Sequence, residues 1–150
     1  MVYLHVSMTS EPNPFDCACF NTRRTARVLG QVYDRALEPS GLKNTQFTAL
    51  AVADAYDGIS ITDLSKAMEI ERTTLTRNLK VLERDGLVKA GPGVDARSKT
   101  VMLTAKGKRR LQVALPFWRQ AHEHMLREFG ANRWKSLQKE LEAMRNRLHP

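Results

Sequence analysis

The stretch from Glu71 to Arg84 gathers cationic and hydroxyl side chains in a helical pattern. On a helix of about 100° per residue, Leu79 and Leu82 fall within about 40° of Leu75. The opposite side carries Thr73, Arg77, Lys80 and Arg84. The leucines suit a core, whereas the cations and hydroxyls on the other side can donate hydrogen bonds to phosphates and base edges. A solvated outer face has the same pattern, so the neighbouring segments decide between the two interpretations.

A short helix with its own start signal precedes this stretch. The hydroxyl of Ser60 can cap it, and Asp63 falls in its positively polarised first turn. Leu64 and Met68 follow, and Glu69–Ile70 leaves room for only a brief turn. Two short helices joined by a tight turn predict a helix-turn-helix, whose second helix enters the major groove of DNA.

A β-hairpin is predicted after the cationic helix. Gly86 is suited to end that helix, and Leu87–Lys89 and Lys99–Leu103 have the composition of short strands. Gly91–Gly93 and the polar run Asp95–Ser98 separate the two strands. A helix-turn-helix followed by such a hairpin is a winged helix, in which the wing extends contacts beyond the major groove.

With these elements in place, the sequence resembles the MarR family of bacterial transcription regulators. The matching groups are Leu75-Thr76-Arg77 with Leu79, Leu82 to Val88 (LERDGLV), Asp95-Ala96-Arg97, and Leu103 to Gly107 (LTAKG). In that family they form the recognition helix, the following strand, the wing tip and the start of a long dimerisation helix. The likeness extends from about Cys17 to the C-terminus. It implies a mainly α fold with a small β-hairpin wing and long N- and C-terminal dimerisation helices.

The resemblance and the cationic helix together predict the DNA-binding residues. We expect Thr73, Thr76, Arg77 and Lys80 to contact bases or phosphates in the major groove. By resemblance, Arg97 would reach a minor groove or its phosphates, and Asp95 would orient it; a narrow minor groove favours an inserted guanidinium. A surface ion pair of little energetic value is the alternative for these two. The full predicted set is Arg72, Thr73, Thr74, Thr76, Arg77, Lys80, Arg84, Asp95, Arg97 and Lys99.

The charge distribution favours a nucleic-acid partner. The 150 residues include 24 Lys and Arg against 16 Asp and Glu, a net charge of +8. Between Thr62 and Arg110 there are 12 basic and 6 acidic residues, so +6 of the excess lies there. A membrane-surface role would instead need a basic amphipathic helix with a bulky apolar face.

No run approaches the ~20 apolar residues of a membrane span, and the N-terminus lacks signal-sequence features. We expect a cytoplasmic protein, with Met1 and Met8 as alternative starts.

The chain divides into four predicted parts: an N-terminal arm (1–14), a dimerisation helix (15–38), a winged helix-turn-helix lobe (42–103) and C-terminal dimerisation helices (104–150). A helix capped by Thr45 should span Thr45–Tyr56, and Thr104 should cap a long helix bent at Pro116 and ended by Gly130. The terminal helices carry more apolar surface than a small lobe can cover. A symmetric homodimer reading two half-sites of a pseudo-palindromic operator is therefore expected.

These features predict a sequence-specific, double-stranded DNA-binding regulator, a homodimeric repressor released by a small-molecule ligand. An activator fits the sequence as well, because the sign depends on where the operator lies. A winged-helix module that binds other proteins is the competing class, and it would lack salt-dependent DNA binding. No enzyme, cofactor or metal is predicted: His122 and His124 stand two apart, whereas ligand pairs on helices usually stand four apart.

The two cysteines, Cys17 and Cys19, leave a second form of regulation open. Thiol-based redox sensing or soft-metal sensing is the alternative to ligand release. Residues two apart on a helix point about 200° from each other, so a disulfide between them would require the turn to unfold. A bridge between subunits or thiol oxidation does not need this, whereas free cytosolic cysteines are more often small buried apolar residues.

If either cysteine is a sensor, peroxide should lower the affinity of the protein for its DNA site. Changing Cys17→Ser and Cys19→Ser should then abolish the response, since the hydroxyl is not oxidised. The measurement is a DNA-binding titration before and after peroxide. A response of wild-type size in the double Ser variant would exclude the thiols.

Overall fold

The computed structural model describes residues 13–92 and 99–148, apart from the side chains of Pro92 and Lys99. In chain order the elements of these ranges are η1 (Pro14–Asp16), α1 (Ala18–Leu37), η2 (Glu38–Ser40), α2 (Asn44–Ala55), β1 (Ile59–Ser60), α3 (Ile61–Met68), α4 (Arg72–Arg84), β2 (Val88–Pro92), β3 (Lys99–Leu103), α5 (Ala105–Phe129) and α6 (Ala131–Leu148). The predicted fold class, mainly helical with a small β wing and long terminal helices, is confirmed.

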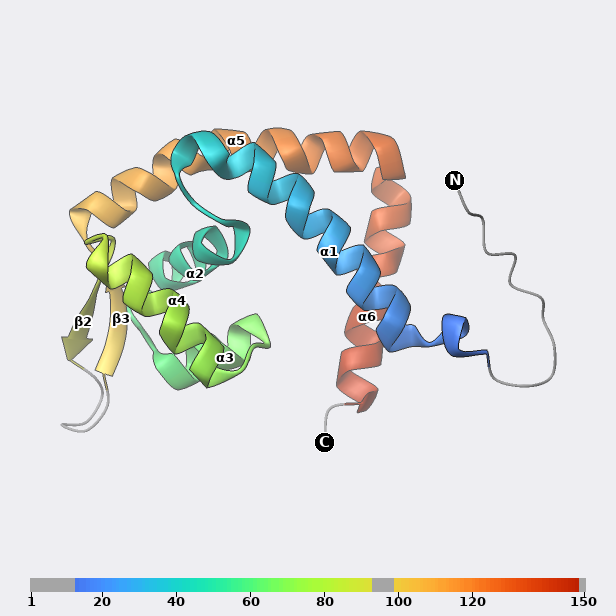
Figure 1. Ribbon diagram of the computed structural model, residues 1–150, viewed down its shortest axis with the longest axis horizontal. Helices are drawn as coiled ribbons and strands as arrows, with labels where there is room; N and C mark the ends of the chain where they lie inside the picture. The colour runs from blue at the N-terminus through green and yellow to red at the C-terminus, as the bar shows by residue number, and fades with distance from the viewer. Residues whose placement is uncertain (1–12, 93–98, 149–150) are drawn as a thin grey trace.

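The lobe formed by α2, α3, α4 and the strands lies beneath the long helices. In Figure 1, α5 runs along the top, α1 descends diagonally from it, and α6 turns down from the far end of α5. Helix α1 packs along α5, and α2 packs against both α3 and α5. The lobe is therefore attached to the long helices through α2 and the start of α5.

Leucines dominate the hydrophobic core. The largest fully buried side chains are Leu37, Leu50, Leu64, Leu75 and Leu82, contributed by the helices α1 to α4. The predicted apolar face of α4 is confirmed, because its leucines are at most 7% exposed. Helix α4 is thus held in the core by the leucines that the helical spacing predicted on one side.

The predicted helix boundaries agree with the structure where the signal is local. Ser60 caps α3, its hydroxyl accepting from the Asp63 amide at 3.0 Å, and Thr104 caps α5 through the Gly107 amide at 3.0 Å. Gly86 follows α4 with a φ of +70°, in the left-handed region that glycine adopts at little cost.

The predicted start of the second helix at Thr45 is wrong. Helix α2 begins at Asn44, whose backbone amide donates to the carboxylate of Asp34 on α1 at 2.6 Å. The Gln46 side chain also accepts from the amide of Lys43 at 2.9 Å. The cap thus comes mainly from another helix, which local sequence does not reveal.

The sheet differs from the predicted two-stranded hairpin. It has three antiparallel strands in the order β1-β3-β2, and Ile59 pairs with Val101. The first predicted strand ended at Lys89, but β2 continues through Gly91 and Pro92. Proline is tolerated because β2 is an edge strand of the described sheet. A Cβ on Gly91 would overlap the Met102 side chain, so this glycine serves close packing rather than a turn.

The terminal helices follow the prediction with one shift at the start. The first helix was expected from Phe15, but a 3-10 turn occupies Pro14–Asp16 and α1 begins at Ala18. Helix α5 runs through Pro116 to Phe129, and its two halves point in different directions in Figure 1. Among the described residues, no helix is both long and apolar enough to cross a membrane.

Leu82→Ala should lower the free energy of unfolding by about 2–5 kcal/mol, because it empties a fully buried site. Lys80→Ala on the exposed side of the same helix should change it by about 0.5 kcal/mol or less. Urea unfolding at one protein concentration measures both. A similar loss in the two variants would contradict the burial of this face.

Candidate nucleic-acid interface

The helix-turn-helix is formed by α3, a tight turn and α4. Glu69 has a φ of +50°, a left-handed conformation that is uncommon for a residue with a side chain. The Ile70 amide donates to the Ser65 carbonyl at 3.1 Å, which closes the end of α3. The chain therefore reverses abruptly and brings α4 against α3, as the sequence predicted.

The outward face of α4 carries the predicted cations and hydroxyls. Thr73, Arg77, Lys80 and Arg84 are all exposed, on the side opposite the buried leucines. Arg72 and Thr74 are exposed in the first turn. The structure thus brings these six side chains onto one helix, with their donors accessible to a ligand.

Thr76 is placed differently from its neighbours. It is half-buried, and its hydroxyl donates to the Arg72 carbonyl one turn earlier at 2.7 Å. With its hydrogen used inside the helix, the oxygen can only accept. Its predicted role in DNA contact is thereby restricted to a donor group on the nucleic acid.

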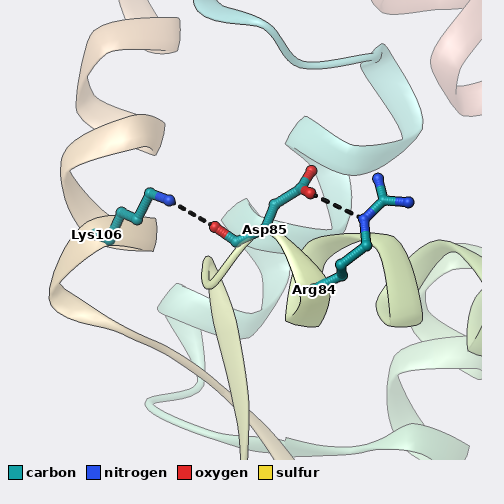
Figure 2. Close-up of polar contacts among 3 residues, drawn as sticks. All are labelled: Arg84, Asp85 and Lys106. Atoms are coloured by element: carbon teal, nitrogen blue, oxygen red, sulfur yellow. Dashed lines mark hydrogen bonds and ion pairs between the residues drawn. The ribbon is translucent and has the colours of Figure 1, made fainter.

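The C-terminal end of α4 has a local ion pair. Arg84 Nε lies 3.3 Å from Asp85 Oδ1, and the two side chains are 75% and 47% exposed. Figure 2 shows this pair, and it shows Lys106 approaching the main chain of Asp85 from the other side. An exposed pair of this kind adds little stability, but Asp85 competes with phosphate for the Arg84 guanidinium.

The N-terminal end of α4 lacks the side-chain cap that is common at helix starts. Its N-cap residue, Glu71, makes no side-chain capping hydrogen bond. Amides in the first turn of a helix point outward and carry a partial positive charge, which suits a phosphate. A groove between α3 and α4 opens beside it, lined by Ser65, Lys66, Glu69, Ile70, Glu71 and Arg72.

Lys66 and Ser65 were missed by the sequence prediction. Lys66 is an exposed cation of α3 that shares this groove with Arg72. The only signal in the sequence was one Lys among polar residues, which is common on any solvated helix. Only the turn between the helices places it beside the start of α4.

The wing tip cannot be placed. Asp95 and Arg97 lie outside the described residues, as does the side chain of Lys99, whose backbone belongs to β3. Their proposed roles therefore stay predictions.

An aromatic cluster links the long helices to the lobe. Tyr33 Oη on α1 lies 3.0 Å from His122 Nδ1 on α5. The His122 ring stacks on Trp118, which stacks on Phe47 of α2 with centroids 5.8 Å apart. Burial raises the pKa of Tyr33, so its hydroxyl remains protonated at neutral pH. Sequence analysis did not pair these residues, because they are distant in the chain.

The cysteines sit at the start of α1. Cys19 is in the first turn, but Cys17 precedes the helix, with φ −57° and ψ 121°. The assumption that both lie in a helix is therefore wrong for Cys17. Both thiols are free and exposed in the single chain, so burial of either would require a second copy.

The histidines do not form a metal site with other residues of the described chain. His122 contacts Tyr33 and Trp118, while His124 Nδ1 lies 3.9 Å from a carboxylate oxygen of Glu128. Within residues 13–92 and 99–148, no three His, Cys, Asp or Glu side chains gather closely enough to hold an ion.

Comparison with known proteins places this geometry in context. The sequence pattern of the MarR family matches residues 40–98, which include α2, α3, α4 and β2. The chain is 48% identical to the M. tuberculosis transcriptional regulator MosR, solved in complex with DNA, over 85% of this chain and 92% of that one, with a TM-score of 0.77. The chain belongs to the MarR family. It is therefore a DNA-binding transcription regulator with a winged helix-turn-helix, not an enzyme.

Two further proteins are similar to it. The transcriptional activatory protein BadR of Rhodopseudomonas palustris is 31% identical over 118 residues, covering 75% of this chain and 67% of BadR. A mutant MarR from E. coli, complexed with operator DNA, has a TM-score of 0.76 at 20% identity, over 84% of this chain and 91% of that one. The latter likeness supports the fold alone.

Asp85→Asn should raise the affinity for any DNA duplex by about three- to five-fold, the equivalent of about 1 kcal/mol for one freed phosphate contact. The reason is that Arg84 loses its competing carboxylate. Glu83→Gln is the matched control, because Glu83 is exposed near the same helix end and has no ion pair with a described residue. Binding titrations at fixed salt compare them. An equal gain in both variants would mean that only net charge matters.

Proposed function

We propose that this MarR-family protein is a homodimer that binds a pseudo-palindromic double-stranded operator, represses transcription there, and is released by a small-molecule ligand. The observation that carries the proposal is the two-sided α4, with leucines buried and cations exposed above a tight helix-turn-helix. MosR, at 48% identity, supports DNA as the partner because its structure is a complex with DNA.

In this proposal the residues divide by position. Arg77, Thr73 and Lys80 read the major groove from the middle of α4, and Thr76 accepts from it. Arg72 and Thr74 hold a phosphate at the start of the helix, where Glu71 provides no side-chain cap. Arg84 contacts the backbone near the other end. The wing residues Asp95, Arg97 and Lys99 extend the contact into the neighbouring groove.

The unburied apolar side chains of the terminal helices support a homodimer. Phe20 and Val28 of α1 are 40% and 61% exposed, and Met144 and Leu148 of α6 are 43% and 75% exposed. None of the residues of α6 is buried within the single chain. A second copy would cover these faces and remove apolar surface from water. Closed two-fold symmetry is the commonest way for one chain to do this.

The aromatic cluster supports release by a ligand. Tyr33, His122, Trp118 and Phe47 connect α1 and α5 to α2, so they span the seam between the long helices and the lobe. A molecule that wedges into this seam would favour another angle between them. It would need only a few kcal/mol of differential affinity to shift the population of spacings.

Two other modes of control have specific support. BadR is described as an activatory protein, so activation is the alternative to repression. The exposed thiols of Cys17 and Cys19 are accessible to an oxidant, which makes thiol modification the alternative to a ligand. A reporter gene under the operator, measured with and without the protein, distinguishes repression from activation.

The test of the proposed function is a titration with the DNA flanking the protein's own gene, beside a scrambled duplex, at several salt concentrations. Tight selective binding that weakens steeply with salt is expected, because phosphate contacts release counterions. Arg77→Ala should lower operator affinity by about 5- to 150-fold, the equivalent of the ~1–3 kcal/mol that a bidentate contact with a base contributes.

Arg77→Lys is the matched control in this titration. It retains the charge but loses the planar fork, so it should recover the salt dependence and only part of the selectivity. Sedimentation should show the same dimer in all variants. If Arg77→Ala leaves operator affinity unchanged, Arg77 does not contact the operator bases. Equal weak binding of wild type to both duplexes, at every salt concentration, would favour a protein-interaction role instead.

A further inference from the structure

The C-terminal end of α4 is joined to the first turn of α5 by hydrogen bonds to consecutive main-chain carbonyls. Lys106 Nζ donates to the Asp85 carbonyl at 2.7 Å (Figure 2), and Thr104 Oγ1 donates to the Gly86 carbonyl at 2.7 Å. The Thr104 amide donates to the Leu87 carbonyl at 3.0 Å. Three successive carbonyls are thus held by two residues at the start of α5.

A glycine allows α4 and α5 to approach closely at this joint, the contact between residues 85–87 and residues 104–107. Gly107 is buried, and a Cβ built on it would overlap the carbonyl of Leu87. The backbone of α5 therefore packs directly on the backbone that leaves α4, with no side chain between them. Such a contact varies less in separation than a layer of side chains that can repack.

The next turn of α5 also holds the lobe, but across a more open space. Arg110 Nη1 donates to the Ser40 carbonyl at 2.8 Å, which ties α5 to the link between α1 and α2. Between Arg110 and Lys106 lies a cavity of about 230 Å³, also lined by Gly41, Leu42, Gln46, Leu82, Asp85 and Leu87. On this side the joint depends on long cationic side chains rather than on close packing.

Leverage makes the joint important. Helix α4 has 13 residues, so at 1.5 Å per residue its N-terminal end lies about 20 Å from the joint. A rotation of about 10° at the joint would move that end by about 3.5 Å, the rise of one base pair in DNA. Small changes at residues remote from DNA can thus alter which bases the reader meets.

We propose that Thr104, Lys106 and Gly107 are spacing-determining residues: by fixing α4 to α5, they set the separation of operator half-sites that the dimer accepts. This rests on the proposed function, since it requires two recognition helices in one dimer on one operator. The residues act through the position of α4 and need no contact with DNA.

Lys106 offers the cleanest test. Thr104 also caps α5, so replacing it would weaken that helix itself. The Lys106 ammonium is exposed, and its bond is to a carbonyl at the negative end of the α4 dipole. Its loss should free the joint without emptying the core.

The experiment compares operators whose half-sites are separated by the native distance, by one base pair fewer, and by one and two more. The full-length wild type should lose about ten-fold or more in affinity per base pair of change, as for a mismatched site. Lys106→Met should reduce that loss to about three-fold or less while binding the native spacing more weakly, because a freed α4 samples more positions. Lys106→Arg should restore the wild-type profile.

Lys108→Met is the matched control. It removes the same charge two residues later, from an exposed side chain whose ion pair with Asp54 of α2 is long, at 4.0 Å. It should keep the dependence of the wild type on spacing and lower all affinities alike. Gly107→Ala gives a second readout: the added methyl pushes α4 away, so the preferred spacing should move rather than broaden. Sedimentation and thermal melting establish that each variant is a folded dimer.

The outcomes separate the two proposals. If the wild type selects one spacing and Lys106→Met has the same profile as Lys108→Met, the joint does not set the spacing and this inference is wrong. If the wild type binds no operator in preference to scrambled DNA, the proposed function fails and the inference falls with it. A flattened profile in Lys106→Met alone, with melting temperatures unchanged, supports the joint.

Discussion

The burial of one leucine face determines where every other group on α4 can be. With Leu75, Leu79 and Leu82 at most 7% exposed, the helix has no freedom to rotate about its axis. Turning it by one residue would expose a leucine and bury a cation, each at a cost of several kcal/mol. The outward direction of Arg77 and Lys80 is therefore a consequence of core packing, not of any contact that these side chains make themselves.

The two ends of α4 are held in opposite ways. At its start, the chain passes through the left-handed Glu69, and the first amides have no side-chain cap from Glu71. At its end, successive carbonyls from Asp85 to Leu87 are bonded to α5. The uncapped start of α4 is suited to a ligand with negative charge. Its bonded end makes α4 follow movements of α5.

The accuracy of the sequence prediction depended on how local each signal was. Ser60, Gly86 and Thr104 mark helix ends through their own backbone or the next turn, and all three were predicted correctly. Asp34 caps α2 from ten residues away, and two-residue β1 forms only because β3 lies beside it. Neither has a local pattern. Gly91 shows the converse error, since glycine beside proline indicates a turn, whereas here it lies within β2, and the Met102 and Thr100 side chains occupy the space of a Cβ.

The joint and the aromatic cluster lie at different positions along α5, which affects how DNA binding could be regulated. Trp118 and His122 contact α1 and α2 in the middle of the helix, while Lys106 and Gly107 hold α4 at its start. In the proposed mode of release, a ligand at the cluster changes the angle between α5 and the lobe. Since Gly107 leaves no slack against Leu87, α4 must follow α5 rather than absorb the change by repacking. Regulation by a ligand at the seam thus requires a rigid joint. With a flexible joint, a movement of α5 would not change the position of α4.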